Sequence, residues 1–176
     1  MKIVHSLFRR IELQLLMNLT ARAFRQPPRR TWTRSNDEAL RIYAEYTRRH
    51  LQDSTADAHL LQRMNSEAYS MGCRLRRLFR LKKDGDVNRF IALLYHNIGI
   101  DIATPAPHQL CFSRCFFSRY YTPEMCLAAS ALDDGIIRGL TGCRHLAFSQ
   151  RITEGFTCCL ATTTNQEQTI NTHYPT

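Results

Sequence analysis

Residues 111–159 read CFSRCFFSRYYTPEMCLAASALDDGIIRGLTGCRHLAFSQRITEGFTCC, and this stretch decides the fold. It holds six of the seven cysteines in the chain. Within it, Thr122, Pro123 and Glu124 predict the start of a helix. Threonine caps free backbone amides, proline suits the first helical position, and glutamate favours the positive end of the helix dipole. We expect this helix to run to about Gly139, since glycine readily ends a helix.

Three strands are predicted around that helix. Residues 108–117 are rich in aromatic and apolar side chains, and residues 145–152 alternate between apolar and polar. Residues 156–163 follow a turn in which Gly155 supplies a positive φ, so we expect the last two strands to pair. The second half of the chain therefore predicts the order strand, helix, strand, strand.

The segment before this stretch predicts helices, at about 2–25, 35–51, 53–81 and 87–97. The first is expected to be amphipathic, and its apolar stripe repeats every four residues: Ile3, Leu7, Ile11, Leu15 and Leu19. Ser35 and Glu38 form a capping-box pattern for the second helix. Asp53-Ser54-Thr55 is the predicted start of the third. In that helix Gly72 marks a place where another element approaches closely, and residues 101–107 are expected to form a loop.

These elements predict an α+β fold, in which N-terminal helices precede a small antiparallel sheet and the Cys126 helix packs on that sheet. We expect three parts: an amphipathic basic helix and linker at 1–34, a single α+β domain at 35–164, and a disordered tail at 165–176. The first helix is expected to pack on the body, or to contact a second copy or an anionic membrane surface through residues 2–25.

Charge and cysteine content indicate which partners and which cellular compartment to expect for the protein. Residues 1–100 hold 19 Lys and Arg against 9 Asp and Glu, whereas residues 101–176 hold 5 against 6. No secretory signal or apolar run of about 18 residues is visible, so we expect a cytoplasmic protein with mostly reduced thiols. The basic half lacks the interleaved aromatic residues that stack on bases, which gives no strong nucleic-acid signal.

Asp133 stands out on the predicted helix that contains Cys126. With about 100° per residue, Asp133 lies within the apolar face and Asp134 lies outside it. Cys126 lies two turns before Asp133 on the same side. A carboxylate on a core-facing stripe needs a partner or has a raised pKa. We therefore expect either a thiol–carboxylate catalytic pair or a structural aspartate bonded to Arg114, Arg119, Arg151 or a loop amide.

The cysteines on the strands follow the two-residue alternation of side chains. That period predicts Cys111, Ser113 and Cys115 on one face of their strand. It also predicts Cys158 and Cys159 on opposite faces, so that at most one of them joins a site. Plain burial of the thiols is the competing interpretation, because free cysteine is often buried.

Residues 108–163 resemble the L-2-amino-thiazoline-4-carboxylic acid hydrolase-like family. The resemblance lies in Arg114-Cys115 on a strand, in Cys126 followed by Asp133 or Asp134 on a helix, and in the hairpin LAFSQRITEGFTCC that ends at Cys158 or Cys159. The ending of this hairpin is also similar to that of 4-vinyl reductase-type small-molecule-binding domains.

The resemblance implies a hydrolase of C–N or C–S bonds in a small cyclic amino acid-like or thiazoline-type substrate. Cys115, Cys126, Asp133 and Cys159 are the expected catalytic residues, and Arg114, Arg119 and Arg151 the expected substrate-binding residues. A thiolate would attack the polarised carbon, Asp133 would act as acid or base, and an arginine would clamp the substrate carboxylate.

Other functions fit the same residues. A small-molecule-binding or sensor domain of the same fold would have the pocket without an activated nucleophile. A basic surface-binding protein would present the arginines of residues 63–89 to an anionic membrane or to nucleic acid. Cys115, Cys126 and Cys159 could converge on a metal, although no paired CxxC motif supports this, and the cofactor stays unknown.

Overall fold

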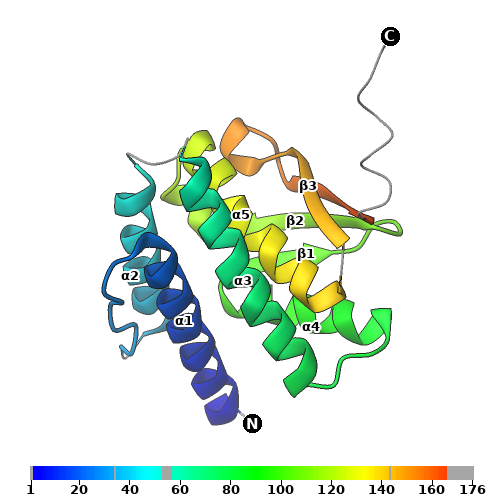
Figure 1. The fold of residues 1–176 in the computed structure, drawn as a ribbon, viewed down its shortest axis with the longest axis horizontal. Helices are drawn as coiled ribbons and strands as arrows, with labels where there is room; N and C mark the ends of the chain where they lie inside the picture. The colour runs from blue at the N-terminus through cyan, green and yellow to red at the C-terminus, as the bar shows by residue number, and fades with distance from the viewer. Residues whose placement is uncertain (1, 34, 53–56, 143, 166–176) are drawn as a thin grey trace.

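Helices fill the first half of the chain, and the sheet is built from the second half (Figure 1). The computed structural model describes residues 2–33, 35–52, 57–142 and 144–165. The helices are α1 (Lys2–Phe24), α2 (Asn36–Leu51), α3 (Ala58–Leu78), α4 (Asp84–Asn97) and α5 (Pro123–Thr141), with short 3₁₀ turns η1 (Phe116–Arg119) and η2 (Ile152–Glu154). The strands are β1 (Ile100–Ala103), β2 (Gln109–Cys115), β3 (Arg144–Gln150) and β4 (Cys159–Asn165).

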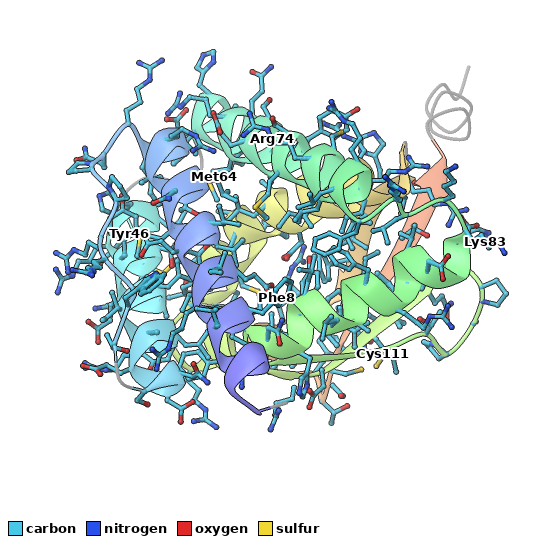
Figure 2. All side chains as sticks on the ribbon, turned by 90° about the horizontal axis from the view of Figure 1, so that it is seen from below. Phe8, Tyr46, Met64, Arg74, Lys83 and Cys111 are labelled. Carbon is cyan, nitrogen blue, oxygen red and sulfur yellow. The ribbon has the colours of Figure 1, made fainter. Side chains whose placement is uncertain are left out.

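The four strands form one antiparallel sheet in the order β1-β2-β4-β3. Helix α5 packs on this sheet and against α3, while α1 and α2 lie on the other side of α3 (Figure 1). The predicted α+β fold is confirmed. Buried side chains of all five helices and the sheet belong to one core, and Figure 2 shows Met64 directed into it.

The strand boundaries differ from those expected. Residues 100–103 form β1 rather than part of a loop, because their backbone pairs with β2 just after Gly99 turns the chain with φ 78°. Strand β2 ends at Cys115, where η1 begins. Strand β4 begins at Cys159 instead of residue 156, because η2 and the left-handed Gly155 (φ 94°) take up the connection.

Helices α3 and α5 begin at a residue whose side chain caps the helix. The Thr122 side chain accepts a hydrogen bond from the amide of Met125, as the sequence predicted for α5. Ser35 precedes α2 but its side chain makes no capping bond, so the expected capping box is absent. Asp57 caps α3, whereas the predicted start at Asp53-Ser54-Thr55 lies outside the described residues. Strand β4 runs to Asn165, the first residue of the predicted tail. The rest of that tail, from residue 166 onwards, lies outside the described residues.

Helix α1 packs on the body through a face that includes Leu19 of the predicted stripe but not Leu7, Ile11 or Leu15. Leu7, Ile11 and Leu15 are 42–49% exposed, whereas Leu16 and Met17 are buried. The reason is geometric: a repeat of four residues drifts by about 40° at each step of a helix with 3.6 residues per turn. The buried residues of α1 are 12, 13, 16, 17, 19, 20, 21 and 23. A contact with a second copy or a membrane through residues 2–25 stays a prediction.

A β-bulge at Ser113 changes which side chains of β2 face inward. Asp101 pairs with Arg114 and Ile102 with Phe112, so Ser113 is an extra residue on β2. An extra residue reverses the alternation of the side chains that follow it. The expectation that Cys111 and Cys115 share a face is therefore wrong: Cys115 turns to the interior with Phe112, and Cys111 lies on the outer face.

A seam of glycines joins α3 to α5. A Cβ atom placed on Gly135 would lie 2.3 Å from the Asn65 carbonyl oxygen, and one on Gly139 would lie 2.5 Å from that of Tyr69. On the facing helix, a Cβ on Gly72 would lie 2.6 Å from the carbonyl oxygen of Ile136. The close approach predicted at Gly72 is confirmed, and α5 is the partner.

Along the described residues, no helix combines the length and apolar character needed to cross a bilayer.

Asp134 connects α5 to both of its neighbours. Its carboxylate accepts hydrogen bonds from Asn65 Nδ2 of α3 at 2.6 Å and from the Leu146 amide of β3 at 2.8 Å, and His145 Nδ1 lies 3.3 Å away. Its side chain is 19% exposed. Although Asp134 lies outside the apolar face, it is therefore a structural group.

We expect Asp134→Ala to lower the free energy of unfolding by about 2–3 kcal/mol, because two partly buried donors lose their acceptor. Urea denaturation followed by circular dichroism measures this change. The matched control is Asp86→Ala, which removes an exposed ion pair with Arg89 and should cost less than about 1 kcal/mol. Equal effects of the two substitutions would contradict the role of Asp134.

Candidate functional site

A cavity of about 100 Å³ lies between the helices and the inner side of β1 and β2. Apolar and aromatic side chains make most of its wall: Leu16, Tyr43, Met71, Leu94, Tyr95, Ile98, Ile100, Phe117, Tyr121, Ala129, Leu132 and Ile136. Two carboxyl groups, of Glu12 and Asp133, and two thiols, of Cys115 and Cys126, complete the wall. The structure therefore brings three of the predicted catalytic residues to one space.

Asp133 faces the cavity from α5, on the side where the helical wheel placed it. Burial raises its pKa to about 6, while the hydrogen bond from Tyr95 and the positive charge of Arg151 act in the opposite direction. The Tyr95 hydroxyl donates to Asp133 Oδ1 at 2.8 Å. The predicted arginine or loop-amide partner is replaced by this tyrosine of α4. Near neutral pH the carboxyl group can therefore both accept and release a proton.

The two cavity thiols are held in their protonated form. Burial raises the pKa of Cys115 to about 12 and also raises the pKa of Cys126. The negative charge of Asp133 adds to both increases. Because the thiolate is the reactive form, this environment works against a cysteine nucleophile in the ligand-free protein.

We therefore expect Cys115 and Cys126 to react with iodoacetamide at neutral pH at least about tenfold more slowly than the half-exposed Cys158. In urea the three thiols should react at similar rates. Peptide mass spectrometry of the alkylated protein measures each rate across pH. Fast alkylation of Cys126 with an apparent pKa below that of free cysteine would contradict this expectation and support the nucleophile hypothesis.

The remaining predicted site residues lie outside the cavity wall. Cys159 is buried, and its sulfur accepts a hydrogen bond from the Ile152 amide at 3.3 Å. Arg114 is exposed and pairs with Asp101 at 3.0 Å on the outer side of the sheet, and Arg119 is exposed on η1. The expected arginine clamp is thus not assembled by these two residues.

Arg151 lies closer to the site. Its side chain is 11% exposed, bonds Glu154 at 3.3 Å, and stacks over the Phe148 ring at 5.0 Å. Its Nε atom is buried and has no hydrogen-bond partner among the described residues, and its charge acts on Asp133. Of the three predicted substrate-binding arginines, Arg151 is therefore the one whose position is compatible with an electrostatic role at the cavity.

Glu12 of α1 is the site residue that the sequence did not predict. Burial raises its pKa to about 8, against the hydrogen bond from Asn97 Nδ2 at 2.8 Å and the charge of Arg9. Glu12 is the only acidic residue in the first 36 positions, and it stands next to Leu13. That isolation within a basic, apolar helix was the available signal.

The three cavity tyrosines already have partners. Tyr43 bonds Thr20 at 3.0 Å, Tyr121 bonds Thr47, and Tyr95 bonds Asp133. Their rings therefore act as fixed walls. Among the described residues, no group of three His, Cys, Asp or Glu side chains is placed to hold a metal ion.

Comparison with known proteins does not add a family: no protein-family model and no curated protein matches the chain. The likeness to the thiazoline hydrolase-like family rests on the motifs quoted above and stays a prediction. Function is therefore argued from the cavity.

Proposed function

We propose that this protein binds a small apolar molecule that carries one amino or hydroxyl group. The observation that carries the proposal is the cavity itself, whose wall is apolar and aromatic apart from two carboxyl groups and two thiols. Concave, mainly apolar sites with a few convergent polar groups are typical of small-molecule binding. This is the non-catalytic binding or sensor alternative that the sequence offered.

Asp133 is the group that would recognise the polar end of the ligand. Above a pH of about 6 its carboxylate is ionised, and Tyr95 occupies only one of its oxygens. An ammonium or hydroxyl group of the ligand would donate to the other oxygen, and a cation would form the stronger, charge-assisted bond. Glu12, protonated below a pH of about 8, would add a donor on the α1 side.

A series of matched five-membered rings tests this proposal: cyclopentane, cyclopentanol and cyclopentylamine, each titrated by thermal shift and calorimetry at pH 7.5. We expect the affinity to increase in that order. Ala129→Phe should remove binding of all three by filling the cavity, with circular dichroism checking that the variant is folded. Asp133→Asn should remove only the preference for the amine.

Two outcomes would overturn the proposal. The first is a failure of all three compounds to bind the folded protein at millimolar concentration. The second is binding that Ala129→Phe leaves unchanged, because the compounds would then lie elsewhere.

A hydrolase at the same cavity is the second candidate, and one observation favours it: Cys115, Cys126 and Asp133 share the wall. It would require the bound substrate to lower a thiol pKa that burial raises. Alkylation of Cys126 with and without 2-aminothiazoline-4-carboxylate tests this, because an activated thiol would react faster when the compound is bound.

The basic surface gives less support for a function than the cavity does. Arg74 and Lys83 lie at the outer surface (Figure 2), but Arg63 donates to the Ala23 carbonyl at 2.9 Å and Arg76 to that of Leu81 at 3.4 Å. These two arginines bond backbone carbonyls of the protein itself. Binding to an anionic membrane or to nucleic acid stays a prediction.

A further inference from the structure

Cys111 and Cys158 meet on the outer face of the sheet. Cys111 pairs with Leu160 across β2 and β4, and Cys158 stands two residues before Leu160, at the end of the bend that leads into β4. Side chains two residues apart lie on the same side of a strand. The two cysteines are therefore diagonal neighbours on adjacent chain segments. Figure 2 shows Cys111 well away from α1 and α2.

The second β-bulge, at Ser149, completes this arrangement. Phe148 pairs with Ala161 and Gln150 with Leu160, so that Ser149 is the extra residue and Gln150 lies on the same face as Cys111. The Gln150 amide donates to the Cys158 carbonyl at 3.4 Å and approaches its sulfur at 3.5 Å. Gln150 thereby holds Cys158 beside Cys111.

The two thiols interact directly. The hydrogen bond with the Cys158 side chain is the largest cause that raises the pKa of Cys111, followed by burial. Both side chains are half-buried, and neither lines the cavity. This pair is thus separate, in position and in environment, from Cys115 and Cys126.

We propose that Cys111 and Cys158 form a reversible dithiol–disulfide couple that a small-molecule disulfide, such as oxidised glutathione, converts to the bridged form. Diagonal neighbours lie about 7–8 Å apart between Cα atoms, slightly more than the roughly 4.4–6.8 Å of a disulfide, so the bridge requires a small shift of the bend that contains Cys158. Both thiols are half-buried and therefore reachable by a small-molecule disulfide.

The exchange takes place in two steps. The Cys158 thiolate attacks one sulfur of the small disulfide, whose S–S bond breaks and releases one thiol. Cys111 then loses its proton and attacks the Cys158 sulfur of the mixed disulfide, which releases the second thiol. The protein loses two hydrogens and the small disulfide is reduced to two thiols, so that electrons and atoms balance.

The bridge would join β2 to the segment that leads into β4, two parts of the chain far apart in sequence. A covalent link of this kind restricts the unfolded chain more than the folded one. The oxidised protein should therefore have a Tm higher by roughly 5–10 °C than the reduced protein.

The test equilibrates the native, full-length protein in buffers of reduced and oxidised glutathione, followed by acid quenching, alkylation and mass spectrometry. We expect that, with increasing oxidised glutathione, the protein loses two hydrogens and takes up two alkyl groups fewer than the reduced protein, with a single peptide link between residues 111 and 158. Dithiothreitol should reverse both. Phenylarsine oxide, which bridges adjacent thiols, should bind the reduced protein in equimolar amount.

Single serine variants separate this pair from the other cysteines. Cys111→Ser and Cys158→Ser should each lose the link and the arsenical binding, and the remaining thiol should stop at the glutathione adduct. Cys73→Ser, on α3, is the matched control and should keep both. The proposal is overturned if no link forms in excess oxidised glutathione, if the link joins other cysteines, or if it persists in Cys111→Ser.

Discussion

Gly139→Ala is expected to lower the free energy of unfolding by about 3 kcal/mol or more, although alanine favours helices over glycine by about 1 kcal/mol. The added Cβ would lie 2.5 Å from the Tyr69 carbonyl oxygen, 2.8 Å from the Cys73 amide nitrogen and 2.9 Å from the Gly72 Cα atom. All three are backbone atoms of α3, which cannot rotate away as a side chain does. The two helices would have to separate, and every contact along the seam would loosen.

Urea denaturation measures this loss, and Gly85→Ala is its matched control. Gly85 also lies in a helix, but in the part of the chain that the structure describes no atom lies within 4 Å of the Cβ it would gain. Gly85→Ala should therefore be neutral or should stabilise the protein by up to about 1 kcal/mol. If Gly139→Ala is as stable as the wild type, the helices do not approach as closely as the structure shows.

The second large effect has the opposite sign. We expect Glu12→Gln to raise the free energy of unfolding at pH 7.5 by about 2–4 kcal/mol, although Glu12 lies in the core. Burial raises its pKa to about 8, so the folded protein holds a proton that the unfolded chain releases near the ordinary value of 4.5. Glutamine imitates the protonated form and can still accept the bond from Asn97.

The pH dependence supplies the decisive sign. Glu12 contributes no penalty below a pH of about 4.5, and its penalty grows until the pH passes about 8. The difference in stability between Glu12→Gln and the wild type should therefore be near zero at pH 4 and increase up to pH 8. Asp133 adds its own decline between its ordinary pKa and about 6, in both proteins alike.

Thermal and urea denaturation between pH 4 and pH 9 measure that difference. Glu45→Gln is the matched control, because Glu45 pairs with Arg41 at the surface of α2 at 3.2 Å. Its effect should stay within about 1 kcal/mol at every pH. A stabilisation by Glu12→Gln that does not change with pH would mean that Glu12 is ionised in the folded protein.

The parts of the fold that depend on local chemistry were predictable from the sequence. Thr122 and Pro123 start α5, and Gly155 turns the chain before β4, because capping and positive φ depend on single residues. The face of α1 was not predictable from the repeat of Leu7, Ile11 and Leu15, since that repeat drifts around the helix. Strand β1 was missed because a short edge strand is stabilised by its partner rather than by its own residues.

Apart from Cys115 of β2, which the family resemblance indicated, the site was predictable only where it lies on one helix. The position of Asp133 on the face of Cys126 followed from helix geometry. Glu12 and Tyr95 reach the cavity from α1 and α4, and pairings between segments so distant leave no local signal. The bulge at Ser113 also placed Cys111 and Cys115 on opposite faces of the sheet, because a two-residue period cannot reveal an inserted residue.

The glycine seam also determines which wall of the cavity can move. Because the backbones of α3 and α5 are in direct contact, the two helices cannot shift relative to each other and should move as a single rigid body. Helices α1 and α2 contact the rest through side chains, which can repack. We therefore expect outward motion of α1 and α2 to set the rate at which a ligand enters and leaves. Backbone amide hydrogens near Glu12 should exchange with solvent faster than those beside Gly139. The cavity would then open on the side of α1 and α2, while the wall made by α3 and α5 stays fixed.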